Sequence, residues 1–206
     1  MFTGIVVGTG QLLRRESRGD GARLVFAASV LPDSAFSLGA SVAVNGCCLT
    51  VIASAPGRFE VDASVETLAH TTLGALPEGS PVNLEPPLAA GDALGGHLVS
   101  GHVDGVGEVI SVRREAVGAW DVRIRLPGAL MRFVATKGSI SVDGVSLTVN
   151  SVSNSAVAVM LIPATRKCTI LGACEPGVKV NIEVDLIARY LDRLLDSRGL
   201  NPGMRK

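Results

Sequence analysis

Side chains that can act as nucleophiles occur at matching places in the two halves of the 206-residue chain. Cys48 lies in the first half, Ser146 lies 98 positions later, and each is followed by Leu-Thr-Val. A thiol or a hydroxyl at such a position can orient a nucleophile or add to an electrophilic carbon itself. His102 can transfer a proton, because the ordinary pKa of an imidazole lies near neutrality.

The same residues also have ordinary structural interpretations. Cys48 could be a small buried hydrophobic side chain, and His97 could simply bond to the backbone. His97 and His102 lie five positions apart in a glycine-rich strand and loop, so they share no helix face and do not predict a metal site. Thr50 and Thr148 could be ordinary strand threonines, although their shared place in the two halves favours a pocket.

An internal repeat relates the two halves. Residues 44–51 align with residues 142–149, and the same offset pairs Thr67 with Thr165, Leu73-Gly74 with Leu171-Gly172, and Asn83-x-Glu85 with Asn181-x-Glu183. Near the N-terminus the offset is 97 and pairs Gly4 with Gly101 and Gly8 with Gly105. Such an ordered series indicates a duplication. Two copies of this length predict two similar domains and not a solenoid.

Each copy is expected to consist of short strands. The alternating or β-branched runs are 5–13, 23–30, 41–44, 49–53 and 81–84 in the first copy, and 103–112, 121–126, 139–142, 147–152, 156–161 and 178–184 in the second. This all-β pattern is typical of a small antiparallel barrel or sandwich. Asn45-Gly46 and Asp143-Gly144 suit two-residue type I′ hairpins. Short helical turns are expected at 32–38 and 130–136, and at 65–73 and 164–171.

The C-terminal segment differs from both copies. Its apolar residues recur at helical spacing over 186–195, and Gly199 and Pro202 would end the helix. Asp185 could cap its N-terminus. The helix could pack back on the second domain, but its broad apolar stripe favours a role in oligomerisation.

Composition excludes several classes of function. Lys plus Arg equals Asp plus Glu at 19 each, which argues against nucleic-acid binding by bulk electrostatics. No apolar run approaches the about 20 residues needed to span a bilayer, and the opening residues do not resemble a secretory signal. Neither a dinucleotide fingerprint, a P-loop nor a G-x-S-x-G motif is present. The four cysteines form no CxxC pair, so a reduced, cytoplasmic protein without a membrane partner is expected.

Four segments make the sequence similar to the riboflavin synthase family. They are residues 1–6 (Met-Phe-Thr-Gly-Ile-Val), 45–50 (Asn-Gly-Cys-Cys-Leu-Thr), 95–105 (Gly-Gly-His-Leu-Val-Ser-Gly-His-Val-Asp-Gly) and 143–149 (Asp-Gly-Val-Ser-Leu-Thr-Val). The resemblance is collinear over residues 1–195. It implies two six-stranded antiparallel Greek-key barrels, at 1–97 and 98–185, followed by an oligomerisation helix and tail at 186–206.

The resemblance also implies an activity. Two molecules of 6,7-dimethyl-8-ribityllumazine would react by transfer of a four-carbon unit, giving riboflavin and 5-amino-6-ribitylamino-uracil without a metal or redox cofactor. The implied active site lies between the N-terminal barrel of one chain and the C-terminal barrel of a neighbour in a homotrimer, which lumazine synthase could surround. The alternative is a non-catalytic, fluorescent lumazine- or flavin-binding protein of the same fold. The polar residues retained in both copies and the complete C-terminal helix favour the enzyme.

Repeat and resemblance together give the candidate site residues. The catalytic candidates are Cys48, His102, Ser146, Lys137, Asp185, Phe2 and His97. The first barrel's expected substrate-binding residues are Gly4, Ile5, Val6, Ser41, Cys48, Leu49, Thr50, Asp62, Ala63, Ser64, Val65, Glu66 and Thr67. The second barrel's are Gly101, His102, Val103, Lys137, Ser146, Leu147, Thr148, Met160, Leu161, Ile162, Pro163, Ala164 and Thr165.

Differences between the two copies are expected to decide which substrate donates the carbon unit. The differing pairs are Cys48 and Ser146, Ile5 and His102, Asp62 and Met160, and Gly39 and Lys137. Asp62, Lys137 and the two threonines are suitable partners for ribityl hydroxyls. Phe2 could be a core anchor, but the interpretation preferred here is that it closes over the ligand. Ala164 and the loop 166–168 depart from the family pattern, which leaves side-chain details of the second pocket open.

Overall fold

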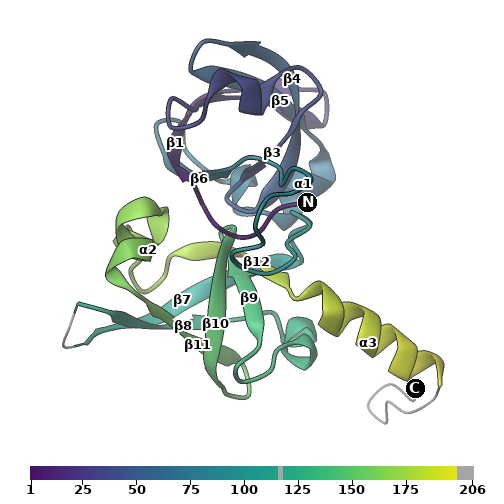
Figure 1. Cartoon of the computed structure of the whole chain (residues 1–206), viewed down its shortest axis with the longest axis vertical. Helices are drawn as coiled ribbons and strands as arrows, with labels where there is room; N and C mark the ends of the chain where they lie inside the picture. Colours follow the sequence, from purple (N-terminus) through teal and green to yellow (C-terminus); the bar gives the residue numbers. More distant parts are fainter. Residues whose placement is uncertain (116–117, 199–206) are drawn as a thin grey trace.

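A computed structural model of the chain describes residues 1–115 and 118–198. It contains two closed six-stranded antiparallel barrels, one above the other in Figure 1, and a helix that extends from the second barrel. The expected all-β class and the expected pair of barrels are therefore confirmed.

The two barrels have the same strand order. The first consists of β1 (Gly8–Arg18), β2 (Gly21–Ala27), β3 (Ser41–Val44), β4 (Cys47–Ala55), β5 (Arg58–Ala63) and β6 (Pro81–Glu85). The second consists of β7 (Gly105–Arg114), β8 (Trp120–Arg125), β9 (Ser139–Val142), β10 (Val145–Val152), β11 (Ala156–Leu161) and β12 (Lys179–Val184). The neighbours around the first barrel, β1-β2-β5-β4-β3-β6, recur as β7-β8-β11-β10-β9-β12, which is a Greek-key arrangement.

Strand alternation separates a core from an outer face in each barrel. In β5, the residues Phe59, Val61 and Ala63 are buried while the intervening residues are not, although the sequence-based expectation had no strand here in the first copy. The core of the first barrel holds Phe26, Phe36 and Phe59, with ring centroids 5.4 and 5.6 Å apart. The core of the second barrel is mainly aliphatic. Burying such side chains is worth about 1.5–3 kcal/mol each and is the main support of each barrel.

Short helical segments occupy matching places in the two copies. They are η1 (Asp33–Phe36), α1 (Val65–His70) and η2 (Thr72–Gly74) in the first barrel, and η3 (Gly128–Phe133), α2 (Pro163–Cys168) and η4 (Ile170–Ala173) in the second. They fall where the sequence predicts helical turns.

Two hairpin turns meet where the barrels join. Asn45 and Gly46 have φ values of 47° and 76°, and Asp143 and Gly144 have 46° and 78°, as type I′ turns require. A Cβ on Gly46 would lie 2.6 Å from the backbone nitrogen of Gly144, and one on Gly144 would lie 2.7 Å from that of Gly46. The close approach of the two turns therefore needs glycine on both sides.

Asparagine side chains connect the barrels across these turns. The Nδ2 of Asn83 donates to the carbonyl of Asp143 (2.8 Å), and the Nδ2 of Asn181 donates to the carbonyl of Asn45 (2.8 Å). The reciprocity of these bonds gives the interface approximate two-fold symmetry.

Two segments, residues 1–6 and 98–103, precede the barrels, and each crosses to the opposite barrel. We call them the crossing segments. Phe2 and Val99 pair through two backbone hydrogen bonds (2.7 and 3.1 Å). Val6 packs against the core of the second barrel, and Val103 packs against the core of the first. The strands expected to start at residues 5 and 103 therefore begin only at Gly8 and Gly105, because the residues before them pack on the other barrel.

The helix α3 (Leu186–Ser197) begins at Asp185, whose carboxylate accepts a hydrogen bond from the backbone of Ile187 (2.9 Å). The predicted N-cap is confirmed, whereas Gly199 and Pro202 lie outside the described residues. Ion pairs of Arg189 with Asp104 (2.6 Å) and of Arg132 with Asp192 (2.5 Å) connect the helix to the second barrel. In the described part of the chain, no helix has the length and apolar character needed to cross a membrane.

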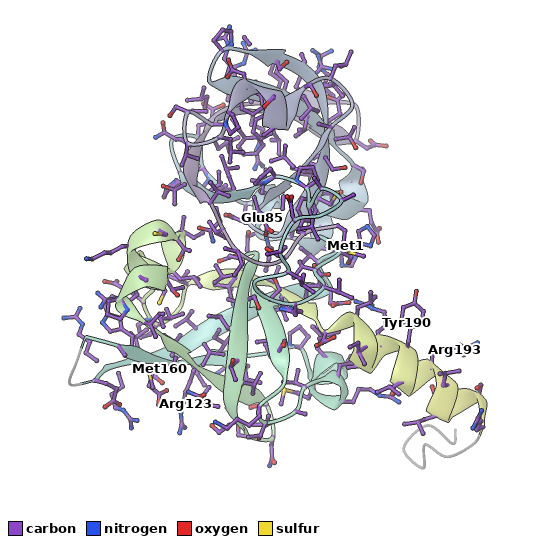
Figure 2. All side chains as sticks on the ribbon, viewed as in Figure 1. Met1, Glu85, Arg123, Met160, Tyr190 and Arg193 are labelled. Atoms are coloured by element: carbon purple, nitrogen blue, oxygen red, sulfur yellow. The ribbon has the colours of Figure 1, made fainter. Side chains whose placement is uncertain are left out.

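The apolar stripe of α3 is not buried within the chain. Ile187, Tyr190, Leu191 and Leu194 are each more than half exposed, and the side chain of Tyr190 projects from the helix in Figure 2. The helix therefore does not pack its apolar stripe back on the second barrel, which was one of the two interpretations of the sequence.

Candidate active site

The candidate residues of the first barrel lie on its outer surface around β4, which we call the first face. Ser41 on β3 pairs with Thr50 on β4, and Cys48 precedes Thr50 on the same face. Thr50 is exposed and Cys48 is half-buried. Asp62 on β5 is exposed beside them and forms two hydrogen bonds with Arg23 (2.9 and 3.0 Å), which hold the pKa of its carboxyl below the ordinary value.

The second barrel has an equivalent outer surface around β10, which we call the second face. Ser146 and Thr148 alternate outward as Cys48 and Thr50 do, with Thr148 paired to Ser139. Met160 on β11 is half-buried in the place of Asp62. The two faces therefore share geometry and differ in chemistry.

Four of the expected substrate-binding residues point the other way. Leu49, Ala63, Leu147 and Leu161 pack in the barrel cores. Their side chains therefore do not line a pocket, because successive side chains of a strand lie on opposite faces.

Each crossing segment borders the face of the opposite barrel and not the face of its own copy. The backbone N–H of Ser146 donates to the carbonyl of Gly4 (2.8 Å), and that of Cys48 donates to the carbonyl of Gly101 (2.8 Å). Residues 4–6 thus border the second barrel's face and residues 101–103 border the first. The expectation that each segment completes the pocket of its own copy is wrong, because both segments cross the pseudo-two-fold axis before their barrels begin.

Ser146 has a histidine partner that Cys48 lacks. The Nδ1 of His97 lies 2.7 Å from the Oγ of Ser146, and its Nε2 is buried without a hydrogen-bond partner among the described residues. Burial lowers the pKa of His97, and the negative charge of Asp185 opposes part of that shift. This arrangement brings together three predicted catalytic residues from three separate segments of the chain. A neutral imidazole beside a hydroxyl can act as a general base.

Cys48 lies instead beside an aromatic ring. Phe2 is fully buried with Ala43 and Val99, and Cys48 packs against this cluster. In this structure Phe2 is a core anchor, because its ring is fully buried and its backbone pairs with Val99. Burial raises the pKa of the neighbouring Cys47 to about 12, which leaves Cys48 as the accessible thiol of the two.

His102 and Lys137 are both exposed. The backbone of His102 donates to the Oγ of Ser100 (3.3 Å), next to the face that carries Cys48. Lys137 has a φ of 69° and replaces Gly39, whose φ is 82°. A lysine in this left-handed conformation costs about 1 kcal/mol relative to glycine, so its position points to a use for its side chain.

The short helices α1 and α2, which lie beside the two faces, begin differently. Ser64 caps α1 by accepting from the backbone of Thr67 (3.1 Å), whereas Ile162 provides no side-chain cap for α2. Val65, Glu66, Ile162, Pro163 and Ala164 are exposed, and Thr165 is half-buried. The predicted residues at the start of both helices are thus accessible beside the faces.

Neither face is a closed cavity. A groove of about 730 Å³ lies between the barrels and is lined by residues such as Leu68, Leu76, Val106 and Lys179, away from Cys48 and Ser146. The two faces are therefore open surfaces that another molecule can cover.

Two residues that shape the site were not singled out from the sequence. Glu85 and Glu183 are buried and bind the crossing segments. The Asn-x-Glu motif, which is repeated in both copies, is the sequence feature that could have identified them.

Both halves of the chain match the family model of the lumazine binding domain, over residues 3–86 and 100–185. The chain belongs to the lumazine-binding family. Within it, the chain is 46% identical over 204 residues to riboflavin synthase of Mycobacterium bovis, covering 97% of this chain and all of that protein. It is 39% identical to riboflavin synthase of Bacillus subtilis, covering 98% and 93% of the two chains. The family resemblance is thereby confirmed, and the chain groups with transferase-type enzymes.

Solved structures of the lumazine-binding family share the fold. The crystal structure of LumP complexed with riboflavin has a TM-score of 0.80 at 28% identity, covering 89% of this chain and 99% of that chain. The structure of LumP complexed with 6,7-dimethyl-8-(1'-D-ribityl) lumazine has a TM-score of 0.78 at 27% identity, with the same coverage.

Proposed function

We propose that the chain is a riboflavin synthase. It converts two molecules of 6,7-dimethyl-8-ribityllumazine into riboflavin and 5-amino-6-ribitylamino-uracil by moving a four-carbon unit from one to the other. The single observation that carries the proposal is the pair of equivalent outer faces in a chain similar over nearly its full length to enzymes of that name. Two identical substrates call for two similar binding faces.

The rate enhancement comes largely from proximity. Two lumazines held face to face react as one bound pair, and effective molarities for such arrangements reach about 10⁵ M or more. Because each face is open, a second face must cover it. We propose that the first barrel of one chain covers the second barrel of a neighbour in a homotrimer. The exposed stripe of Ile187, Leu191 and Leu194 on α3 supports this assembly, because an unburied apolar surface of this kind is typical of an interface.

Ser146 and His97 carry the proposed chemistry of the second face. The reaction removes a proton from the C7 methyl of one lumazine and adds a nucleophile at C7 of the other. The neutral imidazole of His97 accepts a proton through its bond to the Ser146 hydroxyl, and Asp185 stabilises the imidazolium that forms. On the first face, Cys48 takes the place of Ser146, the exposed His102 lies beside it, and Asp62 binds ribityl hydroxyls. On the second barrel, the exposed Lys137 binds the ribityl hydroxyls of the other lumazine.

The surroundings of the protein follow from the same proposal. The four cysteines are free, which supports a reducing, cytoplasmic location. A shell of lumazine synthase around the trimer would deliver the substrate directly.

A non-catalytic lumazine carrier is the second candidate, because the LumP structures with the same fold hold riboflavin or lumazine. A carrier needs only one functional face. The Ser146–His97 pair, together with Cys48 and His102 on the other face, favours turnover.

The test is a direct assay. The purified protein is mixed with 6,7-dimethyl-8-ribityllumazine, and riboflavin is followed by absorbance and chromatography, with Ser146→Ala as a matched control. We expect one riboflavin for every two lumazines consumed. Tight binding of lumazine without any riboflavin would refute the enzyme and favour the carrier.

A further inference from the structure

Two buried glutamates occupy equivalent places at the ends of the last strands of the two barrels. Glu85 closes β6 and Glu183 lies on β12, and both are at most 5% exposed. Among the described residues, no cation forms an ion pair with either carboxylate. Such buried charges are expensive unless hydrogen bonds compensate them.

The compensation comes from the crossing segments. Glu85 accepts hydrogen bonds from the backbone N–H (2.7 Å) and hydroxyl (2.8 Å) of Thr3 and from the backbone N–H of Gly4 (3.1 Å). Glu183 accepts the same set from the backbone (2.7 Å) and hydroxyl (2.6 Å) of Ser100 and from the backbone of Gly101 (3.0 Å). Each carboxylate thus holds a segment about 80 residues away in the sequence.

The held segments border the candidate faces of the opposite barrels. Gly4, held by Glu85 of the first barrel, accepts the backbone N–H of Ser146 in the second. Gly101, held by Glu183 of the second barrel, accepts the backbone N–H of Cys48 in the first.

We infer that Glu85 and Glu183 are reciprocal positioning residues, each in one barrel and each setting the wall of the active face on the other barrel. The inference rests on the proposed function only for what the faces bind. It adds a physical coupling within one chain: the conformation of the first face depends on a carboxylate of the second barrel, and the reverse.

The hydrogen bonds extend to the residues that distinguish the two faces. The Thr3 hydroxyl accepts from the backbone of Ile5 (3.1 Å), and the Ser100 hydroxyl accepts from the backbone of His102 (3.3 Å). Glu183 therefore also fixes the backbone that carries the exposed His102 imidazole.

Only a carboxylate suits the set of donors at each place. Three donors converge on each glutamate, and an ionised carboxylate is the side chain that only accepts. Glutamine has almost the same shape but would direct an N–H₂ group at one of the backbone N–H groups. A Glu→Gln change thus weakens the held segment with little change in volume.

The test uses the accessibility of Cys48 and needs no activity. In a Cys168→Ser background, which removes the exposed thiol, Cys48 is alkylated with iodoacetamide and the labelled peptides are quantified by mass spectrometry. Glu183→Gln is expected to label Cys48 about tenfold faster, which corresponds to the loss of one hydrogen bond to a charged group. Glu85→Gln is the matched control and is expected to change the Cys48 rate much less, because Glu85 touches the surroundings of Cys48 only through Ala43 and through Thr3, the neighbour of Phe2.

Internal controls separate local release from unfolding. The buried thiols of Cys47 and Cys174 report global opening and are expected to stay unlabelled. If Glu183→Gln does not fold, Ser100→Ala removes only the hydroxyl bonds and is expected to give a smaller increase in the same direction. Thr3→Val is its control.

A second readout follows each face by riboflavin binding. Titration of the folded variants is expected to show one weakened site in each, with about tenfold lower affinity, and the two weakened sites differ. Equal Cys48 labelling in Glu85→Gln and Glu183→Gln, or joint labelling of Cys47 and Cys174, would overturn the inference. If the parent protein makes no riboflavin, the proposed function fails, whereas the labelling result still decides the roles of the glutamates.

Discussion

Replacing Asp143 with asparagine is expected to stabilise the protein at alkaline pH. Asp143 and Asn45 occupy equivalent turns, and each side-chain Oδ1 accepts the same backbone hydrogen bond, from Asn181 (2.8 Å) and from Asn83 (2.7 Å). The asparagine twin shows that an amide fits this place. Asp143 differs only in carrying a carboxyl group whose pKa burial raises to about 7.

The raised pKa sets the size and sign of the effect. A change from the ordinary value of 3.8 to about 7 corresponds to about 4 kcal/mol of lost stability once the carboxyl is ionised. A cavity of about 140 Å³ beside Asp143, lined also by Thr72 and Lys179, has room for water, which lowers the expected figure to about 2–4 kcal/mol. Between pH 4 and 7 the folded protein binds this proton more tightly than the unfolded chain does. Stability therefore falls as pH rises through this window, and the full loss is present at pH 8.

The assay is urea unfolding followed by the fluorescence of Trp120, the one tryptophan of the chain. Asp143→Asn is expected to be more stable than the parent by about 2–4 kcal/mol at pH 8 and nearly equal to it at pH 4. Asn45→Asp is the matched control and is expected to lose stability at pH 8. A gain for Asp143→Asn that is the same at both pH values, or a loss at pH 8, would refute the electrostatic reasoning.

Four further substitutions probe other parts of the molecule. Ser146→Ala and His97→Ala are each expected to slow riboflavin formation by about 10²-fold or more, and steady-state kinetics of the double variant should show little further loss, because the two residues share one hydrogen bond. Lys137→Gly is expected to keep or raise the Tm, because glycine relieves the left-handed backbone, while turnover falls; calorimetry and the assay check both. Leu191→Asp on the exposed stripe of α3 is expected to yield monomers in sedimentation velocity; an unchanged oligomer would contradict the proposed assembly.

The repeated features of the fold could be predicted from the sequence. Asn45-Gly46 and Asp143-Gly144 specify their turns locally, since few other residues tolerate positive φ at both positions. The duplication relates the five strands expected in the first copy to five of the six expected in the second. It should also have supplied β5, since its counterpart Ala156–Leu161 was expected and its own residues alternate perfectly between buried and accessible.

The partners of the crossing segments could not be predicted in this way. A repeat shows which residues of the two copies are equivalent, but not which barrel a segment contacts. The same residues are equivalent whether the segments cross to the opposite barrel or stay on their own. Phe2 illustrates the point, because its burial depends on Val99 and Ala43, which no local pattern connects to it. The pairing of His97 with Ser146 has the same cause, since His97 precedes the second barrel and has no counterpart in the first copy.

The crossing of residues 1–6 has a consequence for synthesis on the ribosome. Gly4 is made about 140 residues before its partner Ser146, a delay of about 7–30 seconds at ordinary elongation rates. During this time the first barrel can close its own core and Glu85 can already bind Thr3 and Gly4, whereas the carbonyl of Gly4 and the side chain of Val6 have no second barrel to contact. Residues 4–6 therefore reach their final contacts only after the second half has been made.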